Sequence, residues 1–435
     1  MEKGLIAVDR WTGGSQAYFL THLHSDHTQG LSSSWSKGPI FCSRLTAKLF
    51  PLKFPCFKFS LLRILEIGSW HSITLISPAT GSGTSVDVMA VDAHHCPGAV
   101  MFLFRGEFGC LLYTGDFRWE TTSEREKIGR TMLLNAVNEV AVDILYLDNT
   151  YCNPTYAFPP REVAAQQIVN IIASHPDHDI IIGIDSLGKE DLLLHISSVL
   201  EIKIWVWPER LQTMHLLGFH DIFTTKTSLT RVRAVPRYSF NIETLEGLNT
   251  IRPTIGIMPS GLPWVTKPYE GNDNLGGSFL TSRYNKCRWT GNEESDKSNA
   301  TVGFVKRFHK YIYTVAYSDH SCFSEIEEFI KLVQPINMKG IVSSSSCYVD
   351  PFYYFGRLCG VNQPVKRLHR KYEIKEGDEN RHRTKATFGR VSITKSERKR
   401  ARSMKVKFLG VQASRVKAYR RVQCGAKIVE NDCPD

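Results

Sequence analysis

The sequence has 435 residues, of which 42% are hydrophobic, and it carries a formal net charge of +11 at neutral pH. This length suffices for two domains with packed cores. No run of about 18 apolar residues occurs, so the sequence offers no candidate membrane span and predicts no membrane partner. The eleven cysteines are scattered without a C-x-x-C pair. This usage favours reduced thiols over a disulfide framework or a zinc ribbon.

Short β-rich runs separated by turns dominate the first 150 residues. The predicted strands are Leu5–Asp9, Tyr18–Thr21, Val86–Asp92, Val100–Arg105, Cys110–Thr114 and Ile144–Asp148. Several of these runs end in a histidine or an aspartate. A rigid sheet holds the loops at its strand ends in place, so these ends are suitable positions for chemistry.

From about residue 156 the pattern changes to helices alternating with apolar strands, which indicates a second α/β domain. Pro159 and Pro160 open a helix, because proline is tolerated in the first helical turn. The predicted buried strands are Asp179–Ile184, Ile202–Trp207 and Thr254–Met258. Residues 268–300 are polar and read as an insertion. A strand at Tyr311–Ala316 and an amphipathic helix from Ser324 follow.

The strongest chemical signal is the segment Thr21–His27, which reads THLHSDH and ends an apolar strand. His22 and His24 lie one residue apart in an extended segment, so their side chains point the same way and can bind one metal ion. Asp26 and His27 lie where the chain turns and can face a second ion. Imidazole and carboxylate ligands suit zinc, and a binuclear site needs six or seven of them.

Further candidate ligands occur in similar settings. His94 and His95 follow the strand that ends at Asp92, Asp116 follows a strand and a tight turn, and His320 lies in the segment YSDHS. Each alone is a weak signal, since an isolated histidine is more often a packed or surface residue. Together they supply the ligands that the first motif requires.

The ordered series of these residues resembles the metallo-β-lactamase superfamily, and its β-CASP branch in particular. Five segments carry this resemblance: Thr21–Thr28, His95–Phe104, Thr114–Arg118, Leu147–Pro154 and Ser186–Glu190. They resemble the DNA-directed nucleases of the branch, and the Apollo-type 5′-exonucleases more than the Artemis type. The resemblance covers about residues 1–360.

The resemblance implies an αββα metallo-β-lactamase sandwich with an inserted α/β domain. The predicted domains are residues 1–155 for the first part of the sandwich, 156–308 for the β-CASP domain, 309–360 for the segment that returns to the sandwich, and 361–435 for a basic tail.

By the same resemblance, His22, His24, His95 and Asp116 would hold one metal ion, while Asp26, His27, His320 and the shared Asp116 would hold the other. The residue next to Cys-Pro-Gly is His95, which is therefore preferred to His94, and Cys96 is expected to pack. Asp9 and Asp148 would orient ligands. Asp26, Asp116, Asp9 and Asp148 are the predicted catalytic carboxylates. Ser260, Tyr317 and Lys189 resemble positions near the substrate, although Lys189 is equally consistent with a solvent-facing residue.

One or two divalent ions, expected to be zinc, would provide hydroxide at neutral pH to attack a phosphodiester. The resemblance thus implies a metal-dependent 5′-to-3′ DNA exonuclease of crosslink repair or end processing that acts on single- or double-stranded 5′ ends. An RNA endonuclease or another hydrolase of the superfamily is the first alternative. A non-catalytic DNA-binding scaffold is the second.

The excess positive charge lies in the predicted tail, because residues 361–435 hold 21 Lys and Arg against 8 Asp and Glu. The other 360 residues have a net charge of −2. The basic run at residues 395–407 resembles a nuclear-import signal and predicts a nuclear protein. It could also contact phosphates. A solvated tail without a partner is the alternative.

Overall fold

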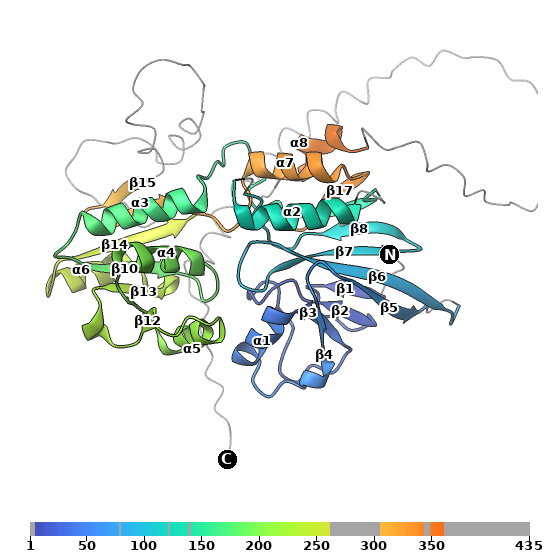
Figure 1. Ribbon diagram of the computed structural model, residues 1–435, viewed down its shortest axis with the longest axis horizontal. Coiled ribbons are helices and arrows are strands. Elements are labelled where there is room, and N and C mark those ends of the chain that lie inside the picture. The colour runs from blue at the N-terminus through green and yellow to red at the C-terminus, as the bar shows by residue number, and fades with distance from the viewer. Residues whose placement is uncertain are drawn as a thin grey trace, which may run out of the picture. The chain divides into compact units, whose positions relative to one another are not determined.

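Three β-sheets occur in the part of the chain that the computed structural model describes, residues 5–77, 80–120, 122–137, 141–261, 305–342 and 349–360 (Figure 1). The predictions for the polar segment 268–300 and for the tail 361–435 concern residues outside these ranges. In the described ranges, no helix is both long and apolar enough to cross a bilayer.

The first two sheets contain most of the strands predicted before residue 150. One sheet has four parallel strands, β1 (Ile6–Val8), β2 (Ala17–Phe19), β3 (Ile40–Ser43) and β4 (Leu62–Leu65). The other has six strands in the order β17-β9-β8-β7-β6-β5. Their bounds are β5 (Trp70–Ile76), β6 (Gly83–Asp92), β7 (Val100–Gly106), β8 (Gly109–Tyr113), β9 (Ile144–Leu147) and β17 (Asn337–Gly340).

Strand β7 explains how these two sheets stack. Its residues are almost all apolar, and successive side chains point to opposite faces, so both faces are buried. Phe102 and Phe104 meet Phe19 of the four-stranded sheet, with ring centroids 5.3 Å and 4.9 Å apart. Met101 and Leu103 belong to a different apolar cluster, which includes residues of helices α2 (Glu124–Val137) and α7 (Phe323–Val333).

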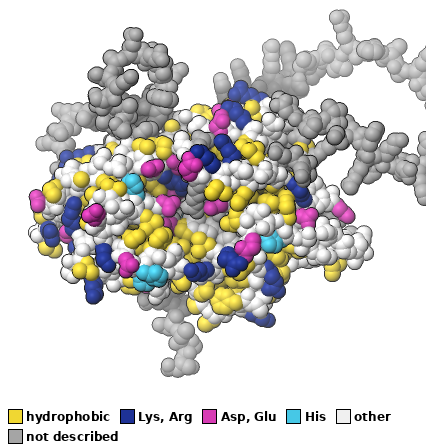
Figure 2. Space-filling view, viewed as in Figure 1, with side chains coloured by type: hydrophobic (Ala, Val, Ile, Leu, Met, Phe, Trp, Pro, Cys, Tyr) yellow, Lys and Arg dark blue, Asp and Glu magenta, His cyan; other side chains and the backbone are white. Residues whose placement is uncertain are grey.

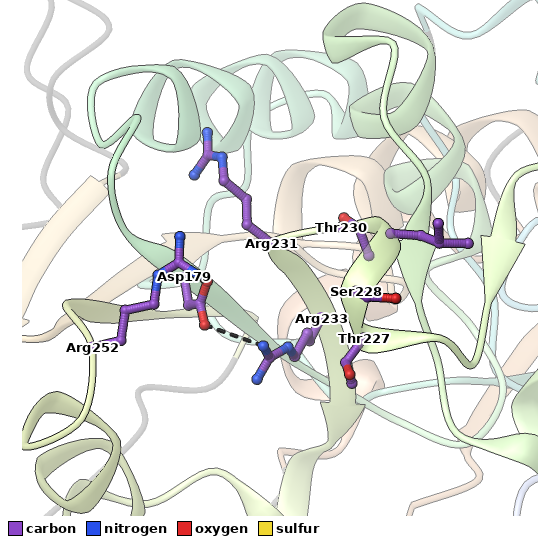
Figure 3. Close-up of a pocket in the computed structure, with 8 residues that line it drawn as sticks. Asp179, Thr227, Ser228, Thr230, Arg231, Arg233 and Arg252 are labelled. Carbon is purple, nitrogen blue, oxygen red and sulfur yellow. Dashed lines mark hydrogen bonds and ion pairs between the residues drawn. The ribbon is translucent and has the colours of Figure 1, made fainter.

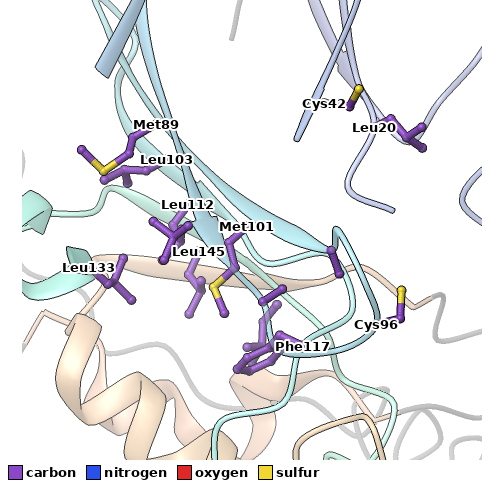
Figure 4. Close-up of a cluster of buried hydrophobic side chains, with 14 of the residues drawn as sticks. Leu20, Cys42, Met89, Cys96, Met101, Leu103, Leu112, Phe117, Leu133 and Leu145 are labelled. Carbon is purple, nitrogen blue, oxygen red and sulfur yellow. The ribbon is translucent and has the colours of Figure 1, made fainter. Parts of the chain in front are cut away.

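Figure 4 shows that second cluster, in which Leu103, Leu112 and Leu145 of the six-stranded sheet lie on the same side as Leu133 of α2. Helix α1 (Arg44–Lys53) covers the outer face of the four-stranded sheet with Leu49 and Phe50. The layers are therefore helix, sheet, sheet and helix, and the fold-class prediction of an αββα sandwich with an inserted α/β domain is confirmed.

The inserted domain is built on a sheet of seven strands in the order β12-β11-β13-β10-β14-β16-β15, parallel except for β15. The strands are β10 (Asp179–Ile184), β11 (Ile204–Trp205), β12 (Phe223–Thr224), β13 (Val232–Pro236), β14 (Thr254–Ser260), β15 (Val305–His309) and β16 (Ile312–Ala316). Its helices are α3 (Arg161–Ala173), α4 (Glu190–Leu200), α5 (Pro208–Leu216) and α6 (Ile242–Asn249). Alternate residues of β10 enter two different apolar clusters, so helices cover both faces of this sheet.

Strand β16 lies in the inserted domain and not in the sandwich, where it was predicted. Residues 309–360 were expected to return to the sandwich, but β16 pairs in parallel with β14 in the seven-stranded sheet. An apolar strand can pair within either sheet, and its sequence does not distinguish the two. The return to the sandwich therefore follows Ala316 and contains α7, β17 and α8 (Pro351–Phe355).

Candidate metal centre

Asp9 directly follows β1 and connects the residues of the first part of the site. Its backbone adopts a left-handed conformation, with φ of 49°, which directs its carboxylate toward the end of β2. The carboxylate accepts hydrogen bonds from the amide and the hydroxyl of Thr21, at 2.9 Å and 2.6 Å. It also lies 2.8 Å from Nδ1 of His27. Asp9 thereby fixes the His27 ring so that Nε2 faces the other ligands.

His22 and His24 follow β2 and project together, as their spacing predicts. Their ring centroids are 4.6 Å apart. His22 is fully buried, and its Nε2 atom has no hydrogen-bond partner among the residues that the structure describes. His24 directs Nδ1 toward Nε2 of His95, at 3.0 Å. An unsatisfied buried nitrogen costs free energy, so the position of His22 Nε2 suits a metal ligand.

His95, and not His94, joins this cluster. His95 Nδ1 donates to the carbonyl oxygen of Asp319, which leaves Nε2 facing the cluster. The His94 ring packs instead against helix α2, where a side chain at Gly129 would lie 3.1 Å from its Nε2 atom.

Asp116 lies at the centre of the cluster. Its carboxylate oxygens lie 3.2 Å from Nε2 of His27, 3.6 Å from that of His95 and 3.7 Å from that of His22. The turn before it requires glycine, because Gly115 has φ of 55° and an added Cβ would lie 2.8 Å from Thr21 Cβ. This close approach brings Asp116 against the segment that bears His22 and His27.

His320 completes the cluster from a distant part of the chain. Its Nε2 atom lies 3.9 Å from Asp116, while its Nδ1 atom lies 2.8 Å from the buried carboxylate of Asp148. Asp148 therefore orients the His320 ring through Nδ1, as Asp9 orients the His27 ring. This carboxylate–histidine arrangement fixes ring orientation in metal sites.

The protonation of the cluster follows from burial and from these carboxylates. Burial lowers the pKa of His22 well below its usual value and that of His95 to about 3. Burial also opposes charge on His27 and His320, but Asp116 with Asp9 raises the pKa of His27 to about 11, and Asp148 with Asp116 raises that of His320 to about 9. These imidazolium charges hold the pKa of Asp116 well below its ordinary value despite its burial.

Three groups of ligand atoms lie close enough to share a cation: His22, His24, His95 and Cys96; His22, His27 and Asp116; and His95, Asp116 and His320. The donor set therefore fits one or two divalent ions that favour nitrogen and oxygen ligands. A cation bound there would replace the protons on His27 and His320, so its binding would release protons.

Cys96 and Asp26 differ from the other members. Burial raises the pKa of the Cys96 thiol well above its usual value, which agrees with the packing role expected for it. The Asp26 side chain is 76% exposed and lies 3.7 Å from His27 Nε2, so it stands at the solvent-facing rim.

The inserted domain reaches this centre through the loop between β10 and α4. The carbonyl oxygen of Leu187 lies 3.0 Å from Nε2 of His24. Arg210 of α5 is buried and holds this loop by donating to the carbonyls of Ser186 and Gly188 and by pairing with Glu190 at 2.8 Å. The orientation of His24 thus depends on the inserted domain.

The candidate substrate residues lie in three different environments. Lys189 has a buried amino group that pairs with Asp185 at 3.0 Å and with Asp319 at 3.1 Å, so it orders the loop and is not solvent-facing. Tyr317 is only 2% exposed and belongs to the core of the seven-stranded sheet. Ser260 is half-buried at the end of β14, where its hydroxyl accepts from Arg237 at 3.2 Å.

Several residues of the site carried no recognised sequence signal. Arg210 lies in a helix without a motif, and Arg237 begins the short 3₁₀ helix η3 (Arg237–Ser239) that follows β13. Asp319 stands next to His320 in the recognised segment, and its position there was the available clue. These residues bind loops or other side chains, and such contacts leave no periodic pattern in a sequence.

The comparisons with known proteins agree with this geometry. Residues 219–346 match the family described as DNA repair metallo-beta-lactamase. The chain is 39% identical to the 5' exonuclease Apollo of Gallus gallus over 353 residues, which cover 79% of this chain and 63% of the relative.

Two further relatives extend the similarity. The Danio rerio 5' exonuclease Apollo is 39% identical over 79% of this chain and 52% of its own length. The DNA cross-link repair protein SNM1 of Arabidopsis thaliana is 32% identical over 74% of this chain and 60% of its own length. The chain thus spans between about half and two thirds of these relatives. Together with the αββα fold and the histidine–aspartate cluster, these matches show that residues 219–346 resemble the DNA repair metallo-beta-lactamase family and that most of the chain is similar to DNA repair proteins of the Apollo and SNM1 types.

Proposed function

We propose that this protein is a metal-dependent 5′-to-3′ DNA exonuclease that acts in DNA repair, including interstrand crosslink repair and end processing. The observation that carries the proposal is the convergence of His22, His27, His95 and His320 on Asp116. The relatives named 5' exonuclease Apollo support the direction of cutting.

The histidines and Asp116 would hold the ions, which we expect to be zinc, and Asp26 would add a ligand from the rim. Bound divalent ions lower the pKa of a coordinated water and balance charge on the phosphoryl oxygens. Asp9 and Asp148 keep Nδ1 of His27 and His320 hydrogen-bonded, so that Nε2 of each ring stays directed at the centre. Asp26 is solvent-facing, and the carboxylate oxygen that does not bind the ion would accept a proton from the attacking water.

A 5′-phosphate would bind where the strands of the inserted domain end beside the centre. Arg237 and Ser260 supply a guanidinium and a hydroxyl there, and such donors suit phosphate oxygens. Lys189 supports this region indirectly, because its charge is already paired with Asp185 and Asp319. We expect Arg237→Gln to raise KM more for a 5′-phosphorylated end than for a 5′-hydroxyl end.

The direct test is to incubate the purified chain with end-labelled DNA and RNA that carry 5′-phosphate or 5′-hydroxyl ends, with zinc or with a chelator. We expect stepwise shortening of single- and double-stranded DNA from the 5′-phosphorylated end and no cutting with the chelator. Exclusive internal cutting of RNA would favour the alternative, an RNA endonuclease of the same superfamily. Binding of DNA without cutting in any metal would indicate a scaffold.

We also propose that the protein acts in the nucleus, on the basis of the basic run at residues 395–407. A fluorescent fusion that loses nuclear accumulation when residues 361–435 are deleted would support this proposal. Unchanged nuclear accumulation would assign import to another part of the chain.

A further inference from the structure

A pocket of about 360 Å³ lies at the amino ends of β10 and β13, away from the metal centre (Figure 3). It is lined by three arginines, by Asp179 and by the hydroxyl residues Thr227, Ser228 and Thr230. The hydroxyl residues come from the 3₁₀ helix η2 (Thr227–Leu229) and the residue that follows it.

The pocket contains more positive than negative charge. Asp179 pairs with Arg233 at 3.1 Å and lies 3.6 Å from Nε of Arg252. The third arginine, Arg231, donates to the backbone carbonyl of Ile172 in the last turn of α3 and to those of His175 and His178 beyond it. Among the described residues, its recorded hydrogen bonds go to carbonyl oxygens and not to a carboxylate. Among the lining residues, three guanidinium groups therefore face one carboxylate.

Two of these guanidinium groups remain able to bind an anion. The Arg252 side chain is 60% exposed and that of Arg233 is 26% exposed. Asp179 lies within ion-pair distance of both and so restrains their direction. The hydroxyl oxygen of Thr230 accepts from the amide of Val232, which leaves its hydrogen available to a ligand. Guanidinium and hydroxyl donors around an open pocket match the oxygens of a phosphate group.

This concentration of positive charge is local. Outside residues 361–435 the chain has a net charge of −2. On the face seen in Figure 2, Lys and Arg side chains are interspersed with Asp and Glu. An exposed ion pair such as that of Arg252 contributes little to folding stability. A structural role therefore accounts for Arg231, whereas Arg252, whose side chain is 60% exposed and lies 3.6 Å from Asp179, can contact a ligand as well as Asp179.

Strand β10 connects the pocket with the metal centre. Asp179 begins β10 in the pocket, and Leu187, just beyond its other end, contacts His24. At about 3.3 Å per strand residue, β10 spans roughly 17 Å. Successive phosphates of one DNA strand advance by about 3.4 Å along a duplex axis, so this span corresponds to about five nucleotides.

We propose that this pocket binds phosphate, and that its ligand is the DNA backbone about five nucleotides from the bond that is cut. The inference rests on the proposed nuclease function. The contact is made to phosphates alone, so it raises affinity for any DNA sequence and adds to the salt dependence of binding.

The test combines a protein change with a DNA change. Arg252→Gln is compared with Arg63→Gln, a matched loss of one exposed arginine on β4, using 5′-phosphorylated duplexes of 20 base pairs. In one duplex the phosphates at nucleotides 4–7 of the cut strand are neutral methylphosphonates, and in the other those at nucleotides 12–15 are. Melting temperatures verify that both variants are folded.

We expect Arg252→Gln to lower kcat/KM on unmodified DNA by about three- to fivefold, and to reduce the salt slope of binding by about one. Neutral phosphates at nucleotides 4–7 should impair the wild type and Arg63→Gln by a similar factor but cause a smaller further loss in Arg252→Gln, in which Arg233 remains the guanidinium that contacts the backbone. Neutral phosphates at nucleotides 12–15 should affect all three proteins equally.

Equal effects of nucleotides 4–7 on all three proteins would overturn the proposal. A titration with inorganic phosphate tests the other source of this ligand, free phosphate. If phosphate binding depends on Arg252 while neutral phosphates at nucleotides 4–7 have no effect that depends on Arg252, the pocket binds free phosphate and the proposed DNA contact is overturned. Failure of the wild type to cut any DNA would instead refute the proposed nuclease function.

Discussion

The carbonyl oxygen of Leu187 lies 3.0 Å from Nε2 of His24, although the two residues are 163 positions apart. This hydrogen bond leaves Nδ1 of His24 as the atom that can bind a cation. The bond joins the inserted domain to a candidate ligand of the sandwich. The inserted domain therefore does more than cover the centre, because it fixes one of the rings that form it.

The first prediction concerns Arg210, which holds the Leu187 loop from α5. Replacing both members of its buried ion pair, Arg210→Met with Glu190→Met, leaves no uncompensated charge, so we expect a loss of stability of only about 1–3 kcal/mol. The freed loop no longer orients His24. We expect the affinity for zinc to fall about 10- to 100-fold, measured by competition with a chromophoric chelator.

The control for this prediction is Arg44→Met with Glu66→Met, which removes the same two charges from an exposed pair on the sandwich. Its zinc affinity should equal that of the wild type. Equal affinities for both double variants would mean that His24 binds the cation without help from the inserted domain.

The second prediction concerns Asp116, which four imidazole nitrogens surround. Asp116→Ala should abolish DNA hydrolysis with the fold preserved, because the variant lacks the carboxylate that all four of these histidines face. Asp87→Ala, which removes a half-buried carboxylate from β6, is the matched control. Near wild-type cutting by Asp116→Ala, with an unchanged circular dichroism spectrum, would refute the shared-ligand assignment.

The sequence predicted the strand ends that form the centre because extended segments with His-x-His spacing have a defined geometry. His22 and His24 project together for this reason. His95, Asp116 and His320 came from recognised segments, and the structure brings them to the same place. Their metal-binding roles remain predictions.

Other features could not be predicted because they depend on tertiary packing. Strand β16 has an apolar pattern that suits either sheet, and only its pairing with β14 assigns it to the inserted domain. Lys189 was as consistent with a solvent-facing residue as with a functional one, and the positions of Asp185 and Asp319 decide between them. Long-range partners of this kind leave no local signature.

The third prediction tests the close approach at Gly115. Gly115→Ala adds a Cβ that would lie 2.8 Å from Thr21 Cβ, in a left-handed backbone conformation. We expect a loss of about 2–4 kcal/mol in the free energy of unfolding, and a large loss of activity because Thr21 and His22 are displaced from Asp116.

Gly247→Ala provides the contrast, since Gly247 lies exposed in helix α6 and nothing lies within 4 Å of an added Cβ. Alanine should stabilise this helix by about 0.5–1 kcal/mol without changing activity. Chemical denaturation measures both variants, and similar effects at the two positions would contradict the steric explanation.

The last prediction concerns a buried carboxylate at the junction with the inserted domain. Glu126 accepts a hydrogen bond from the amide of Glu120, whose side chain pairs with Arg161 of α3 at 3.0 Å. Burial raises the pKa of Glu126 to about 8, and the charges of Glu120 and Glu325 add to the increase. Folding therefore favours the protonated form of Glu126.

The pH dependence of stability follows from this raised pKa. The contribution of Glu126 to stability is fully present below its unfolded pKa of about 4.5, and it is lost as the pH rises through about 8. Glu126→Gln mimics the protonated form at every pH. We expect the variant to gain about 2–4 kcal/mol over the wild type between pH 5 and pH 9, measured by urea denaturation of both proteins. If the free energies of unfolding of the two proteins changed in parallel between pH 5 and pH 9, Glu126 would be ionised in the folded protein. Only a carboxyl group with an unshifted pKa would keep the difference in stability between the two proteins constant over this range.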